Sequence, residues 1–232
     1  MPAMEDTLKP SIHRPIRSFV LRQGRLTQAQ KRALEVHSPV FELPPSGPWQ
    51  SPWPEDRPLF LEIGFGNGEH LAAFAAAHPD WGCIGAEVHA PGVGALLLRL
   101  QAQALDNVRV VHGDVTPWLQ TLPGKLFSLV VIQFPDPWPK KKHRKRRLFQ
   151  ESFLTQLERV LVPGAELQLA TDWEDYAWQM LEVLQKNPHW VNLATPGPFA
   201  AKPPNRIPTR FERRGQALGH GVYDLRFAYT PQ

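Results

Sequence analysis

The segment LEIGFGNG (residues 61–68) carries glycine at every second position, at Gly64, Gly66 and Gly68. Glycine accepts positive φ angles and lets a ligand approach the backbone closely, so such a loop can bind a nucleoside cofactor. The spacing is G-x-G-x-G and differs from the dinucleotide pattern G-x-G-x-x-G. A tight turn between a strand and a helix has the same composition, and the loop alone leaves both interpretations open.

Carboxylates stand at the ends of three consecutive predicted strands, at Glu62, Glu87 and Asp114. Glu87 can accept both hydroxyls of an adenosine ribose and would repel the 2′-phosphate of NADP, although a solvated strand end is the alternative. Asp114 is suited equally to an adenine edge or to the N-cap of a following turn. The three together are a poor pyrophosphate site. They favour S-adenosylmethionine, which carries a sulfonium and an ammonium, and therefore methyl transfer over hydride transfer.

The segment FPDPWP (residues 134–139) places one carboxylate and one aromatic ring in a short loop after the most apolar predicted strand. Prolines on both sides of Asp136 restrict the backbone. We expect Trp138 to stack on a flat polar heterocycle while Asp136 accepts its N–H groups. The alternative is a proline-rich turn with a surface tryptophan.

A run of cations, KKKHRKRR (residues 140–147), follows at once and holds seven of the 26 basic residues. The net charge of the chain is +4, but without the run it has 19 basic and 22 acidic residues. The chain is therefore a mildly acidic body with one concentrated basic patch. Beside the predicted site, seven cations would bind the phosphates of a nucleic acid. A solvated face or a nuclear localisation signal are the alternatives.

Alternating strands and helices must position these groups. Apolar runs predict strands over residues 59–63, 83–88, 108–113, 126–134 and 165–171, and helical spacing predicts helices over 69–78, 93–104, 149–160 and 176–185. The pattern predicts a parallel sheet with helices on both faces, in which ligands bind beyond the carboxyl ends of the strands. Residues 223–229 alternate as an edge or late antiparallel strand does.

Composition excludes several classes of protein. The single Cys83 excludes an intramolecular disulfide framework and any multi-cysteine metal site, and the nine histidines lack metal-ligand spacing, so we expect no metal. No apolar stretch approaches the roughly 18–20 residues of a membrane span. The N-terminus lacks the apolar core of a signal peptide, and we expect a cytoplasmic protein.

Taken together, these residues resemble the bacterial tRNA (guanine-N7)-methyltransferases of the TrmB type. The segment FPDPWPKK is quite specific to that family, whereas the glycine loop is general to class I methyltransferases. The matching segments follow the family's order: RSFVLRQGRLT (17–27), LEIGFGNGEHL (61–71), GAEVHAPGV (85–93), FPDPWPKKKHRKRR (134–147), ATDWEDY (170–176) and TRFERRGQALGHGVYDLRF (209–227).

The resemblance implies an α/β fold, the Rossmann-like fold of class I methyltransferases, with a seven-stranded, mostly parallel sheet. It implies S-adenosyl-L-methionine as methyl donor and N7 of guanine 46 in the tRNA variable loop as acceptor. Ten of the 25 prolines lie in the first 58 residues, with one helix expected over 26–36 and capped by Thr27. We therefore expect a proline-rich arm over residues 1–58 and the methyltransferase domain over 59–232.

The resemblance also implies roles for individual residues, with Asp136 as the catalytic residue. Contacts to the cofactor or its immediate surroundings are implied for Glu62, Gly64, Gly66, Gly68, Glu87, Asp114 and Asp136. Substrate contacts are implied for Lys140, Asp172, Thr209, Arg210, Phe211 and Glu212. RNA contacts are implied for Lys142, His143, Arg144, Lys145, Arg146 and Arg147. For TRFE (209–212) alone, an ordinary exposed polar loop is the alternative.

Two other functions share part of this pattern. An NAD-dependent oxidoreductase would share the glycine loop but has no use for FPDPWPKKKHRKRR, and a non-catalytic RNA-binding protein has no need of carboxylates at successive strand ends. A methyltransferase acting on another RNA is a nearer alternative. We expect a monomer or homodimer that acts on tRNA without a membrane or a metal.

Overall fold

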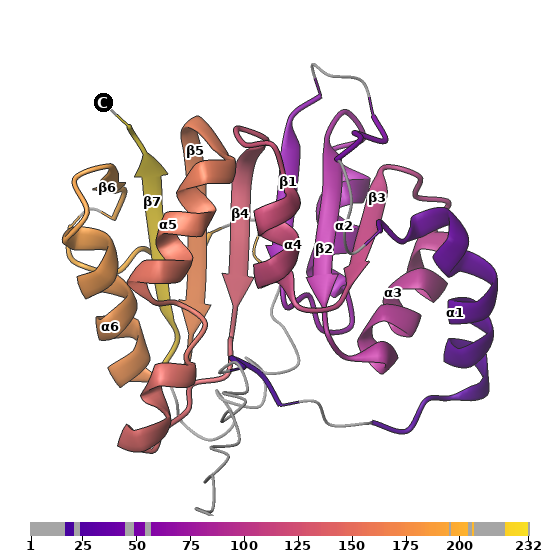
Figure 1. The fold of residues 1–232 in the computed structure, drawn as a ribbon, viewed down its shortest axis with the longest axis horizontal. Coiled ribbons are helices and arrows are strands. Elements are labelled where there is room, and N and C mark those ends of the chain that lie inside the picture. Colours follow the sequence, from indigo (N-terminus) through magenta and orange to yellow (C-terminus); the bar gives the residue numbers. More distant parts are fainter. Residues whose placement is uncertain are drawn as a thin grey trace, which may run out of the picture.

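The computed structural model describes residues 17–20, 24–44, 49–53, 57–194, 196–203, 206 and 221–231. They form one seven-stranded sheet with the order β3-β2-β1-β4-β5-β7-β6 (Figure 1). The strands are β1 (Leu59–Ile63), β2 (Gly82–Glu87), β3 (Val108–His112), β4 (Phe127–Gln133), β5 (Leu161–Thr171), β6 (Trp190–Asn192) and β7 (Tyr223–Tyr229).

Strands β1 to β5 pair in parallel, and β7 pairs antiparallel to both β5 and β6. The expected mostly parallel sheet is confirmed. The late antiparallel strand is confirmed too, but it lies inside the sheet, because the short β6, which was not predicted, forms the edge beside it. Figure 1 shows β1, β2 and β4 pointing one way and β7 the other.

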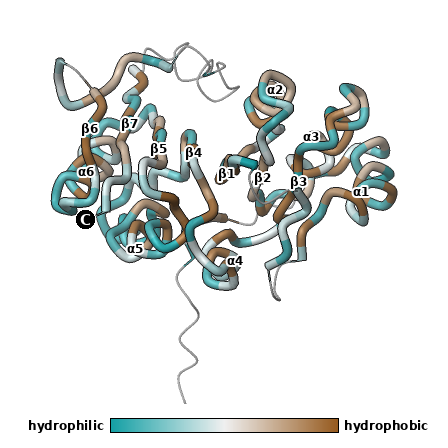
Figure 2. The backbone as a smooth tube through the Cα atoms, turned by 90° about the horizontal axis from the view of Figure 1, so that it is seen from above, coloured by the Kyte–Doolittle hydropathy of each residue, from teal (hydrophilic) through white to brown (hydrophobic). Residues whose placement is uncertain are grey.

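Helices cover both faces of the sheet (Figure 2). They are α1 (Gln28–Phe41), α2 (Glu69–Ala77), α3 (Ala90–Ala102), α4 (Val115–Thr121), α5 (Glu151–Val160) and α6 (Glu174–Gln185). Within β1, Leu59, Leu61 and Ile63 pack with α4, α5 and α6, whereas Phe60 packs with α1, α2 and α3. Because successive side chains of a strand point to opposite faces, the strand contributes to two separate apolar cores, one on each face of the sheet.

Helix α1 ties part of the N-terminal region to the sheet. Thr27 is its N-cap, as expected, and forms a capping box with Gln30. The helix runs five residues beyond the expected end at Val36 and contains Pro39. Helix α1 packs against α3, and the Leu43 N–H donates to the Val110 carbonyl of β3. The boundary at residue 58 stays a prediction, since part of the expected arm packs on the domain.

Among the described residues, no helix is both long and apolar enough to cross a bilayer.

Candidate active site

A cavity of about 770 Å³ opens at the carboxyl ends of β1, β2, β3 and β4. Its walls include Gly113 to Val115 after β3 and three segments that span the last residues of a strand and the loop after it: Glu62 to Asn67 of β1, Ala86 to His89 of β2 and Ile132 to Asp136 of β4. Ser18, Phe19 and Gly24 from the N-terminal region complete it. Parallel strands end at one edge of a sheet, which brings together groups that are far apart in sequence.

The glycine loop adopts the conformation that its composition predicts. Gly64, Gly66 and Gly68 have φ angles of 75°, 58° and 71°, a region that other residues rarely adopt. Gly92 of α3, which sequence reasoning missed, packs under the loop: a Cβ atom there would lie 2.3 Å from the Gly66 carbonyl oxygen. The loop therefore depends on a glycine outside its own motif.

Glu87 lies in the cavity wall but is held by the backbone. Its carboxylate accepts hydrogen bonds from the N–H groups of Gly66 (2.9 Å), Val88 (2.7 Å) and His89 (3.0 Å). The side chain is buried, so the alternative of a solvated strand end is wrong. One carboxylate thus joins the end of β2 to the glycine loop, and these three bonds leave about one of its four lone-pair sites for a ligand.

Glu62 forms a buried pair with His70 of α2, which sequence reasoning did not single out. The carboxylate oxygen and His70 Nδ1 are 3.0 Å apart, both side chains are about 5% exposed, and both line the cavity. Burial alone lowers the pKa of His70, but the Glu62 charge and hydrogen bond outweigh it, so the pKa is raised above its ordinary value. A histidine eight residues after a strand-end carboxylate, on the next helix, is the only signal for this pair in the sequence.

Asp114 is the N-cap of the following helix, and its contact with an adenine edge stays a prediction. Its Oδ1 atom accepts from the Thr116 N–H at 3.0 Å and N-caps α4. The residue also lines the cavity. Because a carboxylate has two oxygens, capping by one leaves the other for a ligand.

Asp136 lies exposed at the mouth of the cavity, in the loop after β4. The loop is strained on both sides, since the non-glycine residues Phe134 and Trp138 have φ angles of 51° and 44°. Trp138 makes contacts within the protein that the sequence did not predict. Its Nε1–H donates to the Ser18 carbonyl at 2.8 Å, and the Arg146 guanidinium lies 3.6 Å from its ring centroid. One ring face is therefore already occupied by a cation and is not open to a heterocycle.

The basic run forms the 3₁₀ helix η1 (Lys141–Arg146), with exposed Lys140 as its N-cap. Lys142, Arg144 and Lys145 are exposed, and the His143 ring meets the Trp138 ring edge-on. Arg146 also donates to the carbonyl of Arg17. Asp136 before this run and Leu148 after it both line the cavity, so the exposed cations lie in a segment that begins and ends at the cavity wall.

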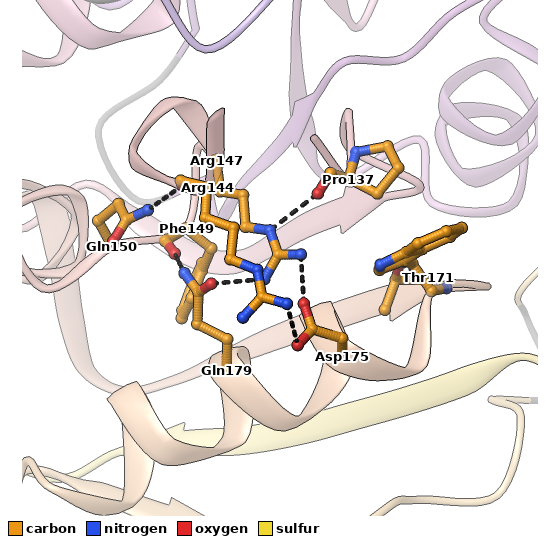
Figure 3. Close-up of polar contacts among 9 residues, drawn as sticks. Pro137, Arg144, Arg147, Phe149, Gln150, Thr171, Asp175 and Gln179 are labelled. Carbon is orange, nitrogen blue, oxygen red and sulfur yellow. Dashed lines mark hydrogen bonds and ion pairs between the residues drawn. The ribbon is translucent and has the colours of Figure 1, made fainter. Parts of the chain in front are cut away.

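Arg147, in contrast, is only 2% exposed, and its side chain points toward Asp175 and Gln179 (Figure 3). Its guanidinium donates to the Pro137 carbonyl, to Gln179 and to Asp175 of α6. The prediction that Arg147 contacts RNA is therefore wrong, because a buried guanidinium with three protein acceptors does not face a phosphate.

The remaining expected substrate residues are only partly described. Asp172 follows β5 and is half-buried. Thr209, Arg210, Phe211 and Glu212 lie outside the described residues. Arg206, just before them, is buried, pairs with Asp224 of β7 at 2.8 Å and lies 5.8 Å from the Phe134 ring centroid. Within the described part of the chain, no cluster of three His, Cys, Asp or Glu residues is arranged to hold a metal ion.

Comparison with known proteins adds to this geometry. Residues 56–225 match the family model described as "Putative methyltransferase". A protein of Acidithiobacillus ferrooxidans is 58% identical over 98% of this chain and 100% of its own length. A protein of Methylococcus capsulatus is 49% identical over 96% of this chain and 98% of its own. Each is named tRNA (guanine-N(7)-)-methyltransferase.

Solved structures share the fold at low sequence identity. The 16S rRNA methyltransferase KamB matches with a TM-score of 0.53 and 16% identity, over 75% of this chain and 88% of that one. The 16S rRNA (adenine(1408)-N(1))-methyltransferase of Catenulisporales acidiphilia matches with a TM-score of 0.51 and 18% identity, over 75% and 86%. The sheet is therefore the Rossmann-like α/β fold of class I methyltransferases.

Proposed function

The chain belongs to the tRNA (guanine-N(7)-)-methyltransferase family, and from this we infer that it transfers a methyl group from S-adenosylmethionine to N7 of guanine 46 in the variable loop of tRNA. The observation that carries the inference is the 58% identity to a relative of that name across 98% of this chain. The match is not confined to the fold, because it includes the loop with Asp136 and the cations after it. A soluble cytoplasmic enzyme, as monomer or homodimer, fits this reaction.

The cavity suits S-adenosylmethionine, which supplies an electrophilic methyl group on a sulfonium. Its volume of about 770 Å³ is in the range of small-molecule sites. Glu62 provides a buried negative charge for the cationic end, and Glu87 and Asp114 present oxygens for the ribose and the adenine. Gly64, Gly66 and Gly68 let the backbone of the loop approach the ligand. Carboxylates at three strand ends suit a cation and disfavour a pyrophosphate.

Asp136 acts on the guanine by position and charge. Guanine N7 carries an in-plane lone pair and no proton, so it needs no general base before it attacks a methyl group. The exposed carboxylate at the cavity mouth accepts hydrogen bonds from the other edge of the base and stabilises the positive charge that develops on the methylated ring. Lys140, Asp172 and residues 209–212 complete the guanosine contacts.

The exposed cations of η1 bind the tRNA backbone. Lys142, Arg144 and Lys145 are exposed in the segment between Asp136 and Leu148, which both line the cavity, so phosphates flanking an extruded guanine would pass near them. His143 and Arg146 border the same surface through Trp138. Because the rest of the chain is mildly acidic, the basic run over residues 140–147 is the part that attracts RNA, and RNA binds on the face that carries it.

Labelled S-adenosylmethionine tests the proposal. The protein is incubated with the label and a tRNA transcript, the RNA is digested, and the nucleosides are separated. We expect label in 7-methylguanosine, and none when the transcript carries adenine at the target position. Label in a different nucleoside, or in another RNA but not in tRNA, would overturn the assignment of the substrate.

A further inference from the structure

Arg147 is a member of the basic run that RNA binding does not explain. A buried guanidinium is tolerated only where acceptors replace its water. Here its Nε donates to the Pro137 carbonyl at 2.8 Å and its Nη1 to Gln179 at 2.7 Å, while Nη2 pairs with Asp175. The Tyr176 ring lies 4.7 Å from the guanidinium carbon. Each of the three guanidinium nitrogens therefore has an acceptor within the protein.

These partners come from two parts of the molecule. Asp175, Tyr176 and Gln179 belong to the first turns of α6. Pro137 belongs to the loop that carries Asp136, and Figure 3 shows Arg147 between Pro137 on one side and Asp175 and Gln179 on the other. Helix α6 also holds the chain just after Arg147, because the Tyr176 hydroxyl accepts from the Phe149 N–H and Gln179 donates to the Phe149 carbonyl. The side chain of Arg147 therefore bridges a well-anchored helix and a loop.

The loop requires such a support. Phe134 and Trp138 are held in the left-handed region, which non-glycine residues keep only where the surroundings determine it. The bond from Arg147 reaches the carbonyl of Pro137, between Asp136 and Trp138. A displacement of about 1 Å in a reacting group can lower a rate on the order of 10²-fold.

We propose that Arg147 is a positioning residue. Its ion pair with Asp175 of α6 holds the loop in the conformation that places Asp136 at the cavity. This inference rests on the proposed methyl transfer. Asp175 has a second partner, Arg144, whose Nη2 lies 2.9 Å from its other oxygen and which is 45% exposed. One carboxylate thus holds an exposed arginine that faces solvent and a buried one that holds the loop.

The two arginines provide the test. Arg147→Lys and Asp175→Asn should lower the single-turnover rate at saturating S-adenosylmethionine and tRNA about 10- to 100-fold, because Asp136 loses its position. In Arg147→Lys, which leaves the exposed cations and their partners in place, the slope of tRNA affinity against salt should stay that of the wild type. Arg144→Gln should instead lower the slope by about 0.7–0.9, the value of one phosphate contact. Glu182→Gln, on the exposed side of α6, should change neither quantity.

The double variant separates positioning from stability. If both residues act through one ion pair, Arg147→Lys with Asp175→Asn should be no slower than the slower single variant. Gln179→Ala removes one of the three acceptors of Arg147, together with the bond to the Phe149 carbonyl, but leaves the ion pair and the bond to Pro137. It should give a smaller loss of rate, which keeps the test usable if another variant folds poorly. Thermal unfolding is measured for each variant, and rates are compared per folded enzyme.

Three results would decide against the inference or its premise. A salt slope lowered by Arg147→Lys, with the rate at saturation retained, would make Arg147 an RNA ligand. A lower melting temperature with an unchanged rate would make the pair purely structural. Failure of the wild type to form 7-methylguanosine would overturn the proposed function, and the salt slopes would still show whether Arg147 contacts RNA.

Discussion

Four carboxylates of the site differ in what surrounds each of them. Glu62 pairs with a buried histidine, Glu87 accepts three backbone N–H groups, Asp114 caps a helix and Asp136 is exposed. In the sequence, Glu62, Glu87 and Asp114 are indistinguishable, because each stands at the end of a predicted strand. Their partners indicate different tasks, since a carboxylate bonded by backbone shapes a loop and an exposed one is available to a substrate.

Replacing Asp136 with asparagine tests its charge at nearly constant size. An amide presents donors where the proposed role needs acceptors, so Asp136→Asn should lower the single-turnover rate on the order of 10²–10³-fold, the scale of one preorganised electrostatic contact. Binding of tRNA should suffer less. The wild-type rate should be flat through neutral pH. A methyl-transfer step that depends on a base titrating near neutrality would contradict this role and direct attention to His143.

The raised pKa of His70 makes part of the stability depend on pH. Burial lowers the pKa, Glu62 raises it by more, and Arg206 opposes the rise. A folded-state pKa above the ordinary value of 6.5 means that protonated His70 stabilises the fold. The advantage of the wild type over His70→Gln should be complete below pH 6.5 and fall as the pH rises through the native pKa. Urea unfolding of both proteins across this range measures it, and a constant difference would refute the pairing.

At the scale of elements, the glycine loop is shaped by the helix packed beneath it. Gly92 of α3 faces the Gly66 carbonyl, and Glu87 at the end of β2 accepts from the Gly66 N–H. The loop is therefore held from two elements that lie after it in the sequence. Its conformation depends on the close approach of α3 and β1, which any added volume would disturb.

Gly92→Ala tests this approach. The new methyl carbon would lie 2.3 Å from a backbone oxygen, which cannot move aside as a flexible side chain can. We expect S-adenosylmethionine to bind roughly tenfold to a hundredfold more weakly, in line with about 1–3 kcal/mol of overpacking. Calorimetry measures the affinity. Gly221→Ala is the control, because a Cβ atom there has no neighbour within 4 Å; equal effects of the two substitutions would contradict the packing argument.

The helix η1 makes a separate prediction about RNA. Lys141, Lys142 and Lys145 are exposed, so their replacement by glutamine should not disturb the fold. The slope of tRNA affinity against salt should become shallower by about 0.7–0.9 for each phosphate that the protein no longer binds, while the affinity for S-adenosylmethionine stays unchanged. Titrations at several salt concentrations measure the slope. An unchanged slope would mean that these lysines only solvate the surface.

At the scale of the whole molecule, the cavity is lined by residues whose strands pack against the apolar cores on both faces of the sheet. The strands that end in it pack with α4, α5 and α6 on one face and with α1, α2 and α3 on the other. Ser18 and Phe19 add the N-terminal region. A ligand that binds only when these parts are assembled stabilises the entire fold by mass action.

S-adenosylmethionine at about 100 times its dissociation constant should add about 2.7 kcal/mol of stability, which raises the melting temperature by roughly 5–10 °C for a chain of this size. NAD at the same concentration should give no shift. Glu87→Ala should lose most of the shift, since it removes both a ribose acceptor and a support of the glycine loop. Thermal scans measure all three, and a shift by NAD alone would favour an oxidoreductase.

Much of the fold and of the cavity could be read from the sequence. Apolar runs of strand length alternate with helical periods, and this pattern specifies a parallel sheet covered on both faces. Parallel strands all end at one edge, so the positions of Glu62, Glu87, Asp114 and Asp136 at or just after the ends of their strands sufficed to predict that they lie together. The positive φ angles of the three glycines likewise follow from residue type.

Only the tertiary structure decided which cations of the basic run are exposed and which are buried. Lys145 and Arg147 stand two positions apart in the same basic run, yet one is exposed and the other is buried against Asp175, 28 residues later. Trp138 is held by the carbonyl of Ser18, 120 residues earlier. Local sequence encodes charge and periodicity, but the burial of a given charge depends on acceptors that distant elements bring to it on folding. That is why the sequence predicted a basic surface beside the site and could not identify the one arginine that turns inward.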